Sequence, residues 1–333
     1  MLSTRLIEPG LVEVGETDTP NGRGLAVVRM QTLGVCGTDS SIVAGKIPVD
    51  LPRVLGHEGI GVVEQPGPLG LVAAGTRVLI DPSISCETCD LCHRGYPNLC
   101  RNGGLMGRDV DGLFATYAAV QERQLLVVPN DVSSDEAGAI QVLGTCVHAV
   151  KATPIRLGDV AVVIGLGVAG QLIVQLLTAS GARVIGVTRS PEKRDLAIRH
   201  GARSAVAPAD AKEAVMEATS GRGAEVVVEA VGSQATFAQA IELAGAAATV
   251  VFFGTATGSS GGLPYYLLYM NELTIRNPRA ATKADYQRAI DLVADGSISS
   301  APLVSYRFPL AEADKALEAA QESSTLKVLI TVD

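Results

Sequence analysis

Short apolar runs separated by glycine, proline and aspartate fill the chain from residue 25 to about residue 130, among them LAVVRMQTLGV, GIGVVEQPG, TRVLIDP and LFATYAAV. Such runs, bounded by turn-forming residues, are typical of β-strands. We therefore expect a strand-rich, barrel-like first half. At Ser133 the pattern changes to SSDEAGAIQVLGTCVHAVKA, whose serine start, early acids and alanine-rich continuation predict a helix.

After Asp159 buried strands alternate with helical stretches, in the order AVVIG, VAGQLIVQLLTASGA, RVIGVT, PEKRDLAIRHGA, VVVEAV, ATFAQAIELAG and ATVVFFG. Strands separated by helices of this length predict βαβ units and a parallel sheet. The glycine- and serine-rich residues 258–262 predict a mobile loop. DYQRAIDLVADGSI, from Asp285, predicts a helix, and the final TLKVLITVD predicts a strand that rejoins the first half.

A chain of 333 residues is long enough for two domains, each with its own core. The pattern predicts an α/β protein: a discontinuous β-rich domain of residues 1–145 and 285–333, and a doubly wound parallel-sheet domain of residues 146–284. A chain of this length is long enough to bury a ligand-binding cleft.

Composition narrows the class of partner. An apolar fraction of 47% and a charged fraction of 19% are typical of a globular protein. The formal net charge of −8 argues against binding to nucleic acid or to an anionic membrane, because both require a basic face. The amino terminus lacks a signal-like apolar core, and no apolar run reaches about 18 residues. We expect a cytoplasmic protein with a small-molecule partner.

Four cysteines lie within fifteen residues, in the spacing Cys86-x-x-Cys89-x-x-Cys92-x7-Cys100. Four thiolates in one compact loop suit tetrahedral zinc with no open coordination position, which is a structural site. An iron–sulfur cluster and free thiols are the alternatives. The predicted zinc lobe spans residues 83–102.

A second set of candidate ligands lies in LGVCGTD, with Cys36, Thr38 and Asp39, and in LGHEGIG, with His57 and Glu58. One cysteine, one histidine and a carboxylate on separate loops would leave zinc an open position, as a catalytic site requires. Taken singly, a cysteine or histidine is more often a structural residue.

VVIGLGVAG places Gly165, Gly167 and Gly170 in a G-x-G-x-x-G pattern between a predicted strand and a predicted helix. This context is the one in which the pattern binds the pyrophosphate of a dinucleotide. The next strand ends in VTRSPEKR, which offers Thr188 and Arg189 where an NAD site usually has an acid. We therefore favour NADP over NAD, with Lys193 as a further contact.

The order of CGTD, GHE, the four-cysteine lobe, GLGVAG and a final LKV strand resembles the medium-chain zinc-dependent alcohol dehydrogenase family, especially its polyol, threonine and sugar dehydrogenases. The resemblance covers almost the whole chain. It implies a GroES-like catalytic domain, a Rossmann domain, and two zinc ions per chain, one catalytic and one structural. It also implies a homodimer or homotetramer, paired through the strand near ELTIRN.

The resemblance implies that Cys36 and His57 bind the catalytic zinc, with Glu58 beside the metal, and that Asp39 orients His57. Thr38 would bond the substrate oxygen and pass on its proton. Further positions implied by the resemblance are Gln141 as a zinc ligand, Thr145 against the nicotinamide, and Lys327 on a cofactor phosphate. Relatives carry Glu, Asp or Cys at the Gln141 position, and many carry His where this chain has Ser40 and Ser41.

The activity implied is hydride transfer between NADP(H), or NAD(H), and the hydroxyl-bearing carbon of a secondary alcohol or polyol. The first alternative is an aldose 1-dehydrogenase of the glucose type. The second, from another class, is a non-catalytic NADP-binding regulatory protein, which would have no use for the open metal site that Cys36 and His57 predict.

Overall fold

The computed structural model describes residues 1–151, 153–255 and 262–332. The chain divides into two compact units, Met1–Gly144 with Ala280–Asp333, and Thr145–Arg279. The sequence placed these boundaries at residues 145/146 and 284/285. Apart from Gly262, the predicted loop at 258–262 lies outside the described residues.

The first unit is built on a seven-stranded sheet in which the only parallel pair among the described strands is β17 with β18. Its path runs β10 (Leu125–Val127), β6 (Arg77–Ile80), β5 (Glu58–Gln65), β3 (Ala26–Val35), β18 (Lys327–Thr331) and β17 (Val304–Pro309), with β9 (Tyr117–Val120) also paired to β3. The buried side chains of these strands form one apolar cluster. The strand-rich first half is thereby confirmed.

Two smaller sheets complete this unit: β2 (Leu11–Glu16), β1 (Leu2–Glu8) and β4 (Arg53–Val54) form one, and β7 (Ser83–Ile84) and β8 (Gly104–Leu105) form the other. The β1–β2 hairpin was not predicted from the sequence, where the strand signals begin at residue 25. Its second strand, LVEVGE, is largely exposed and therefore has no continuous apolar run.

The helices of the first unit are α1 (Gly37–Val43), α2 (Asp90–His93), α3 (Ser134–Ala137), α10 (Lys283–Ala294) and α11 (Ala313–Ala319), with 3-10 turns at Pro97–Leu99, Glu122–Gln124, Ala301–Leu303 and Leu310–Glu312. The alanine-rich run after Ser133 forms two helices, α3 and α4 (Ile140–Val150), because α3 ends at Gly138. The boundary between the units falls within α4.

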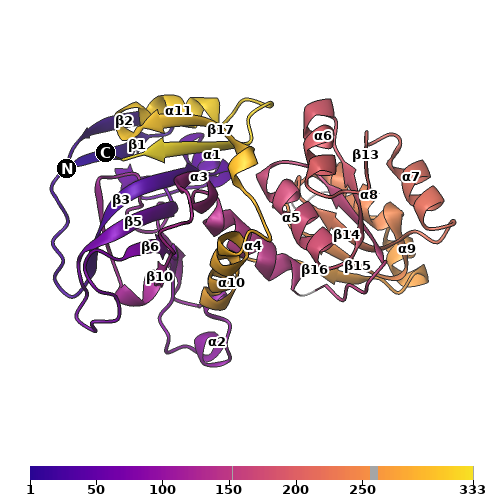
Figure 1. The fold of residues 1–333 in the computed structure, drawn as a ribbon, viewed down its shortest axis with the longest axis horizontal. Coiled ribbons are helices and arrows are strands. Elements are labelled where there is room, and N and C mark those ends of the chain that lie inside the picture. The colour runs from indigo at the N-terminus through magenta and orange to yellow at the C-terminus, as the bar shows by residue number, and fades with distance from the viewer. Residues whose placement is uncertain (152, 256–261, 333) are drawn as a thin grey trace. The chain divides into compact units, whose positions relative to one another are not determined.

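The carboxyl-terminal segment returns to the amino-terminal half, as the sequence predicted. Strand β18 pairs antiparallel with β3, opposite Thr32–Val35. Figure 1 shows α11 and β17, in yellow, beside β1 and β2, in indigo. Residues from both ends of the chain therefore meet in one core, and this matters for the site described below.

The second unit contains a six-stranded, fully parallel sheet in the order β13 (Ser204–Val206), β12 (Arg183–Val187), β11 (Val160–Ile164), β14 (Ala224–Glu229), β15 (Ala244–Phe252) and β16 (Thr274–Arg276). The order 3-2-1-4-5-6 in sequence numbering is that of a Rossmann-type doubly wound sheet, which confirms the predicted fold class. Helices α5 (Val168–Ala179), α6 (Pro191–Arg199), α7 (Ala211–Ala218), α8 (Gln234–Leu243) and α9 (Tyr265–Met270) connect the strands.

Candidate active site

Cys36, His57 and Glu58 converge at one end of the first unit's large sheet. Cys36 directly follows β3 and caps α1, while His57 directly precedes β5, whose first residue is Glu58. Because β3 and β5 are antiparallel neighbours that pair Gly34 with Glu58, the end of one strand meets the start of the other. One ligand atom from each of the three side chains lies within 4.8 Å of the other two.

Asp39 links two of these candidate ligands. Its Oδ2 accepts a hydrogen bond from the backbone N–H of Cys36 at 2.9 Å, and its Oδ1 lies 3.2 Å from Nδ1 of His57. The carboxylate is fully buried. Burial lowers the pKa of His57, but the charges of Asp39 and Cys36 outweigh it and hold that pKa well above its ordinary value of 6.5. The carboxylate of Asp39 faces Nδ1 of His57, so Nε2 is the nitrogen that can bind a metal.

Lys327 lies elsewhere than the resemblance implied. Its ammonium is buried, forms an ion pair with Glu58, and donates to the carbonyl oxygen of Val35 at 3.1 Å. A side chain with 1% exposure and two bonded partners is not presented to a cofactor phosphate, so this part of the prediction is corrected. Lys327 was misassigned because its burial depends on the long-range pairing of β18 with β3.

The donor set fits a divalent cation by charge. Cys36 as thiolate, Asp39 and Glu58 carry three formal negative charges, and Lys327 supplies one positive charge. A neutral His57 leaves two negative charges uncompensated in a largely buried place, which is unfavourable unless a cation or protons balance them. In addition, Oε1 of Glu58 is buried without a hydrogen-bond partner within the described ranges. A zinc ion would satisfy both requirements.

Gln141 lies on α4 and is buried together with Tyr286 of α10. Its Nε2 donates to the Tyr286 hydroxyl oxygen at 3.2 Å, which leaves Oε1 as the atom that the side chain can offer to a metal. Burial raises the pKa of Tyr286 far above its ordinary value, so the hydroxyl stays protonated. Tyr286 lies on the buried face of α10, next to the buried Asp285, and no sequence motif marks it.

Thr38 lies on α1 between Cys36 and Asp39 and is half-buried. Ser41, on the next turn, donates its hydroxyl hydrogen to the carbonyl oxygen of Gly37 at 3.0 Å. Cys146 belongs to the core of the second unit: it is fully buried, and its Sγ lies 3.7 Å from the carbonyl oxygen of Ala169. Cys146 is therefore a small core residue and not a ligand of the candidate metal site.

The four cysteines of the lobe bring their sulfur atoms together. The sulfur–sulfur distances are 3.4 to 3.9 Å for the pairs Cys86–Cys100, Cys89–Cys92 and Cys89–Cys100. Sulfurs around a tetrahedral zinc, with Zn–S bonds of about 2.3 Å, lie about 3.8 Å apart, so the geometry fits that ion. Hydrogen bonds with Thr88 lower the pKa of Cys86 to about 5, whereas burial and the neighbouring sulfurs raise that of Cys92 to about 12. A cation would remove this competition between like charges.

In the second unit, the glycine turn joins β11 to α5. Gly165 has φ +92° and donates its N–H to Val187 of the adjacent strand at 2.9 Å, while Gly167 caps α5 without a side-chain bond. A Cβ at Gly170 would collide with the carbonyl oxygen of Gly165. The turn therefore requires glycine, and it leaves the first N–H groups of α5 available to an anion. Thr145 lies on α4 of the same unit and is half-buried.

Thr188 and Arg189 directly follow β12, next to the strand that enters the glycine turn. The Arg194 guanidinium donates to the carbonyl oxygens of Thr188 and Arg189, at 3.0 and 3.2 Å, and thereby holds this loop. Lys193 is half-buried, and burial lowers its pKa. The sequence suggested Arg194, together with Lys193, as a further contact to the 2′-phosphate; in the structure its guanidinium bonds the backbone of the loop instead.

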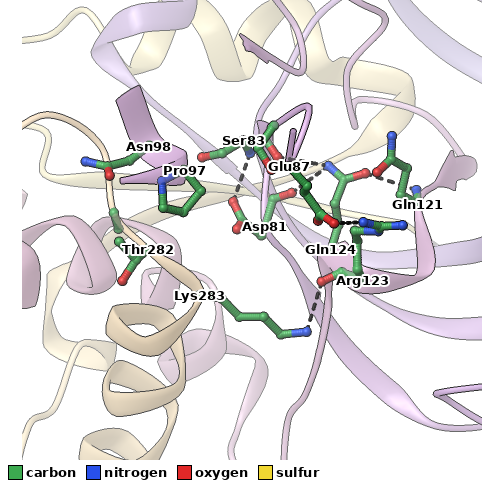
Figure 2. Close-up of a pocket in the computed structure, with 12 residues that line it drawn as sticks. Asp81, Ser83, Glu87, Pro97, Asn98, Gln121, Arg123, Gln124, Thr282 and Lys283 are labelled. Carbon is green, nitrogen blue, oxygen red and sulfur yellow. Dashed lines mark hydrogen bonds and ion pairs between the residues drawn. The ribbon is translucent and has the colours of Figure 1, made fainter. Parts of the chain in front are cut away.

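A separate polar pocket of about 160 Å³ lies in the first unit around Asp81 (Figure 2). Asp81 Oδ1 accepts the N–H of Ser83 at 2.9 Å, and its backbone oxygen accepts from Gln124 Nε2 at 2.8 Å. Lys283 donates to the carbonyl oxygen of Arg123 at 2.9 Å. Burial raises the pKa of Asp81 from 3.8 to about 6, although its bonds with Ser83 and the charge of Lys283 oppose the shift.

Two family descriptions match the chain. Residues 22–130 match the alcohol dehydrogenase GroES-like domain, and residues 168–295 match the zinc-binding dehydrogenase domain. The first confirms the predicted GroES-like character of the β-rich half. Within the described ranges, no helix combines the length and the apolar character that a membrane span needs.

Full-length relatives agree. The chain is 31% identical to an alcohol dehydrogenase of Geobacillus stearothermophilus over 297 residues, which is 87% of each protein. It is 29% identical to a sorbitol dehydrogenase of Halalkalibacterium halodurans over 317 residues, 93% of this chain and 92% of that one. A proposed zinc-binding dehydrogenase of Sinorhizobium meliloti 1021, solved with NADP bound, has a TM-score of 0.93 and 32% identity, covering 99% and 98% of the two chains.

The raised pKa of Asp81 predicts a pH-dependent stability. In the unfolded chain this carboxyl has its ordinary pKa near 4, so between about pH 4 and pH 6 the folded state binds more protons and loses stability as pH rises. Asp81→Asn keeps an oxygen for the Ser83 N–H but carries no charge. We expect it to raise the free energy of urea unfolding by on the order of 2 kcal/mol at pH 7 and by roughly half as much at pH 5. An equal effect at both pH values would contradict the assignment.

Proposed function

The chain belongs to the zinc-binding alcohol dehydrogenase family, and we propose that it oxidises the hydroxyl-bearing carbon of a secondary alcohol or polyol with NADP, or carries out the reverse reduction. The observation that carries the proposal is the convergence of Cys36, His57 and Glu58 on one point, with Asp39 behind His57. A non-catalytic NADP-binding protein would have no use for this arrangement. The sorbitol dehydrogenase among the relatives supports a polyol substrate over an aldose.

In the proposed site, Cys36, His57 and Glu58 would hold a catalytic zinc, and the four-cysteine lobe would hold a second, structural zinc. When bound, the catalytic ion would supply Lewis acidity at the substrate oxygen, and NADP would supply the hydride acceptor. Thr38 accepts the proton of the substrate hydroxyl and passes it toward solvent, with Ser41 on the following turn of α1. Asp39, 3.2 Å from Nδ1 of His57, would orient the ring so that Nε2 is the nitrogen offered to the metal. Gln141 as a further ligand and Thr145 against the nicotinamide stay predictions.

Cys36→Ser tests the zinc assignment. Because the variant removes the thiolate, we expect kcat/KM with a responsive polyol to fall by roughly a thousandfold or more, the range that loss of a transition-state charge stabiliser gives. Zinc content, measured by mass spectrometry, should fall from two ions per chain to one. Cys89→Ser is the matched control: it should release the other ion. A Cys36→Ser enzyme with undiminished turnover would rule out the mechanism.

NADP is favoured over NAD by the loop after β12. The loop has Thr188 and Arg189, whose side chain is exposed, at the position where an NAD site usually has an acid. An acid there would repel a 2′-phosphate, whereas the Arg189 guanidinium attracts it. The bonds of Arg194 to the two carbonyl oxygens keep the loop in place. The relative from Sinorhizobium meliloti was solved with NADP, which supports the same choice.

Arg189→Ala should weaken NADP much more than NAD. Loss of a charge-assisted bond to phosphate is worth about 1.5–3 kcal/mol, so KM for NADP is expected to rise by roughly ten- to a hundredfold while KM for NAD changes little. Arg199→Ala, which removes an exposed arginine at the other end of α6, is the control. Equal effects on both cofactors would exclude a 2′-phosphate contact at Arg189.

We also propose a homodimer formed through the edge of the parallel sheet. Strand β16 is the terminal strand of the sheet and is exposed along its length. Helix α9, which precedes β16 in the chain, exposes Tyr266 and Tyr269 at 72% and 80%, and Met270 at 55%. An exposed strand edge flanked by large apolar side chains favours pairing with a second copy over exposure to water.

Tyr269→Glu with Met270→Glu should convert the dimer to a monomer, because charges at the centre of the interface would lose their hydration there. Sedimentation or light scattering measures the mass. Tyr306→Glu, on β17 of the other unit, is the control and should leave the dimer intact. A monomeric wild-type protein, or a dimer that survives the double substitution, would refute the proposed interface.

A further inference from the structure

Gln171 is a fully buried polar residue directly after the last glycine of the turn, on α5. Its side-chain amide has three partners. Nε2 donates to the carbonyl oxygen of Lys193 at 2.8 Å and lies 3.5 Å from that of Leu166. Oε1 lies 3.0 Å from Nδ1 of His200. A buried amide with every polar atom matched is costly to disturb.

The three partners come from separate segments. Leu166 lies within the glycine turn, Lys193 in the first turn of α6, and His200 at the carboxyl-terminal cap of the same helix. One glutamine therefore ties the turn to both ends of α6. Neither Gln171 nor His200 belongs to a recognisable sequence motif, because the two residues lie 29 positions apart in the chain.

The bonds also define the state of His200. Since Nε2 of Gln171 donates to carbonyl oxygens, its Oε1 faces the ring and accepts, so the hydrogen of the imidazole must be on Nδ1. Burial, together with the charge of Arg199, lowers the pKa of His200, which keeps the ring neutral. Gln171 and His200 thus form one neutral hydrogen-bonded pair, and the remaining ring nitrogen, Nε2, is buried without a partner in the described part of the chain.

We propose that the Gln171–His200 pair positions the two cofactor-binding segments relative to each other: the glycine turn, which receives the pyrophosphate, and residues 188–190, which receive the ribose and its 2′-phosphate. The inference rests on the proposed function. The physical link is short: Lys193, held by Gln171, is next to Arg194, whose guanidinium holds the carbonyl oxygens of Thr188 and Arg189. Lys193 N–H also donates to Ser190 Oγ, so the loop and the start of α6 move together.

Positioning of the two segments and simple stabilisation of the fold have different effects on ligand binding. NADP spans both segments and gains from each contact only when their spacing is right, because the second contact forms within an already bound molecule. A ligand that reaches only the loop does not sense the spacing. Loss of the pair should therefore weaken the whole dinucleotide selectively.

The test compares two probes by titration calorimetry: NADP, and adenosine 2′-monophosphate as the loop-only ligand. In Gln171→Leu/His200→Leu both polar partners are replaced by apolar side chains, which preserves packing better than either single change. We expect Kd for NADP to rise about tenfold, Kd for adenosine 2′-monophosphate to stay within about twofold, and KM for NADP to rise with kcat unchanged. Gln175→Leu removes another buried glutamine of α5 that none of these bonds involves, and it should leave both dissociation constants unchanged.

His200→Gln provides a second arm, because an amide can replace the ring as donor to Gln171; it should retain wild-type affinity for NADP. An unchanged Kd for NADP in the double variant would overturn the inference, and so would equal weakening of both probes, which would show that the pair only supports the fold. If the wild-type protein binds NAD and not NADP, the cofactor proposal fails, and the same comparison with NAD and adenosine, which lacks the phosphate that reaches the glycine turn, still decides the role of the pair.

Discussion

The chain concentrates more negative charge at the junction of β3 and β5 than its own cations can balance. A thiolate and two carboxylates lie at or next to one point, most of them buried, and Lys327 offsets only one of the three charges. Such an arrangement is stable only with protons or a metal ion, since an uncompensated buried charge costs several kcal/mol. A proton on His57, whose pKa is raised, is one way to balance the negative charge, and a bound divalent ion is the other. The zinc chemistry proposed for the chain follows from this imbalance.

The same constraint explains why the first unit is discontinuous in sequence. Lys327 reaches Glu58 only because β18, from the carboxyl end, pairs with β3, from the amino end. The large sheet thus assembles ligand, orienting acid and counter-cation from three distant segments. In the second unit, the proposed cofactor site is formed mainly by the backbone, because the glycine turn presents N–H groups to the pyrophosphate. The buried side chain of Gln171 bonds both this turn and the start of α6, next to the loop that follows β12.

The elements that could be predicted from the sequence are those that depend on neighbouring residues. The glycine turn and the cysteine lobe are each encoded within about fifteen residues, each parallel strand is a short apolar run, and the order of the motifs indicated the family. Prediction failed where a role depends on distant pairing. Lys327 was assigned to a phosphate because its burial is visible only in the sheet, and the Gln141–Tyr286 and Gln171–His200 pairs join segments 145 and 29 residues apart. The β1–β2 hairpin was missed because its outer strand is exposed and mixed in polarity.

The most direct measurement is anomalous diffraction from crystals of the wild-type protein on both sides of the zinc absorption edge. The account predicts two zinc peaks per chain, one within the four-cysteine lobe and one bonded to Sγ of Cys36 and Nε2 of His57. A single peak in the lobe, with Cys36 and His57 bonded to protein groups instead, would contradict it.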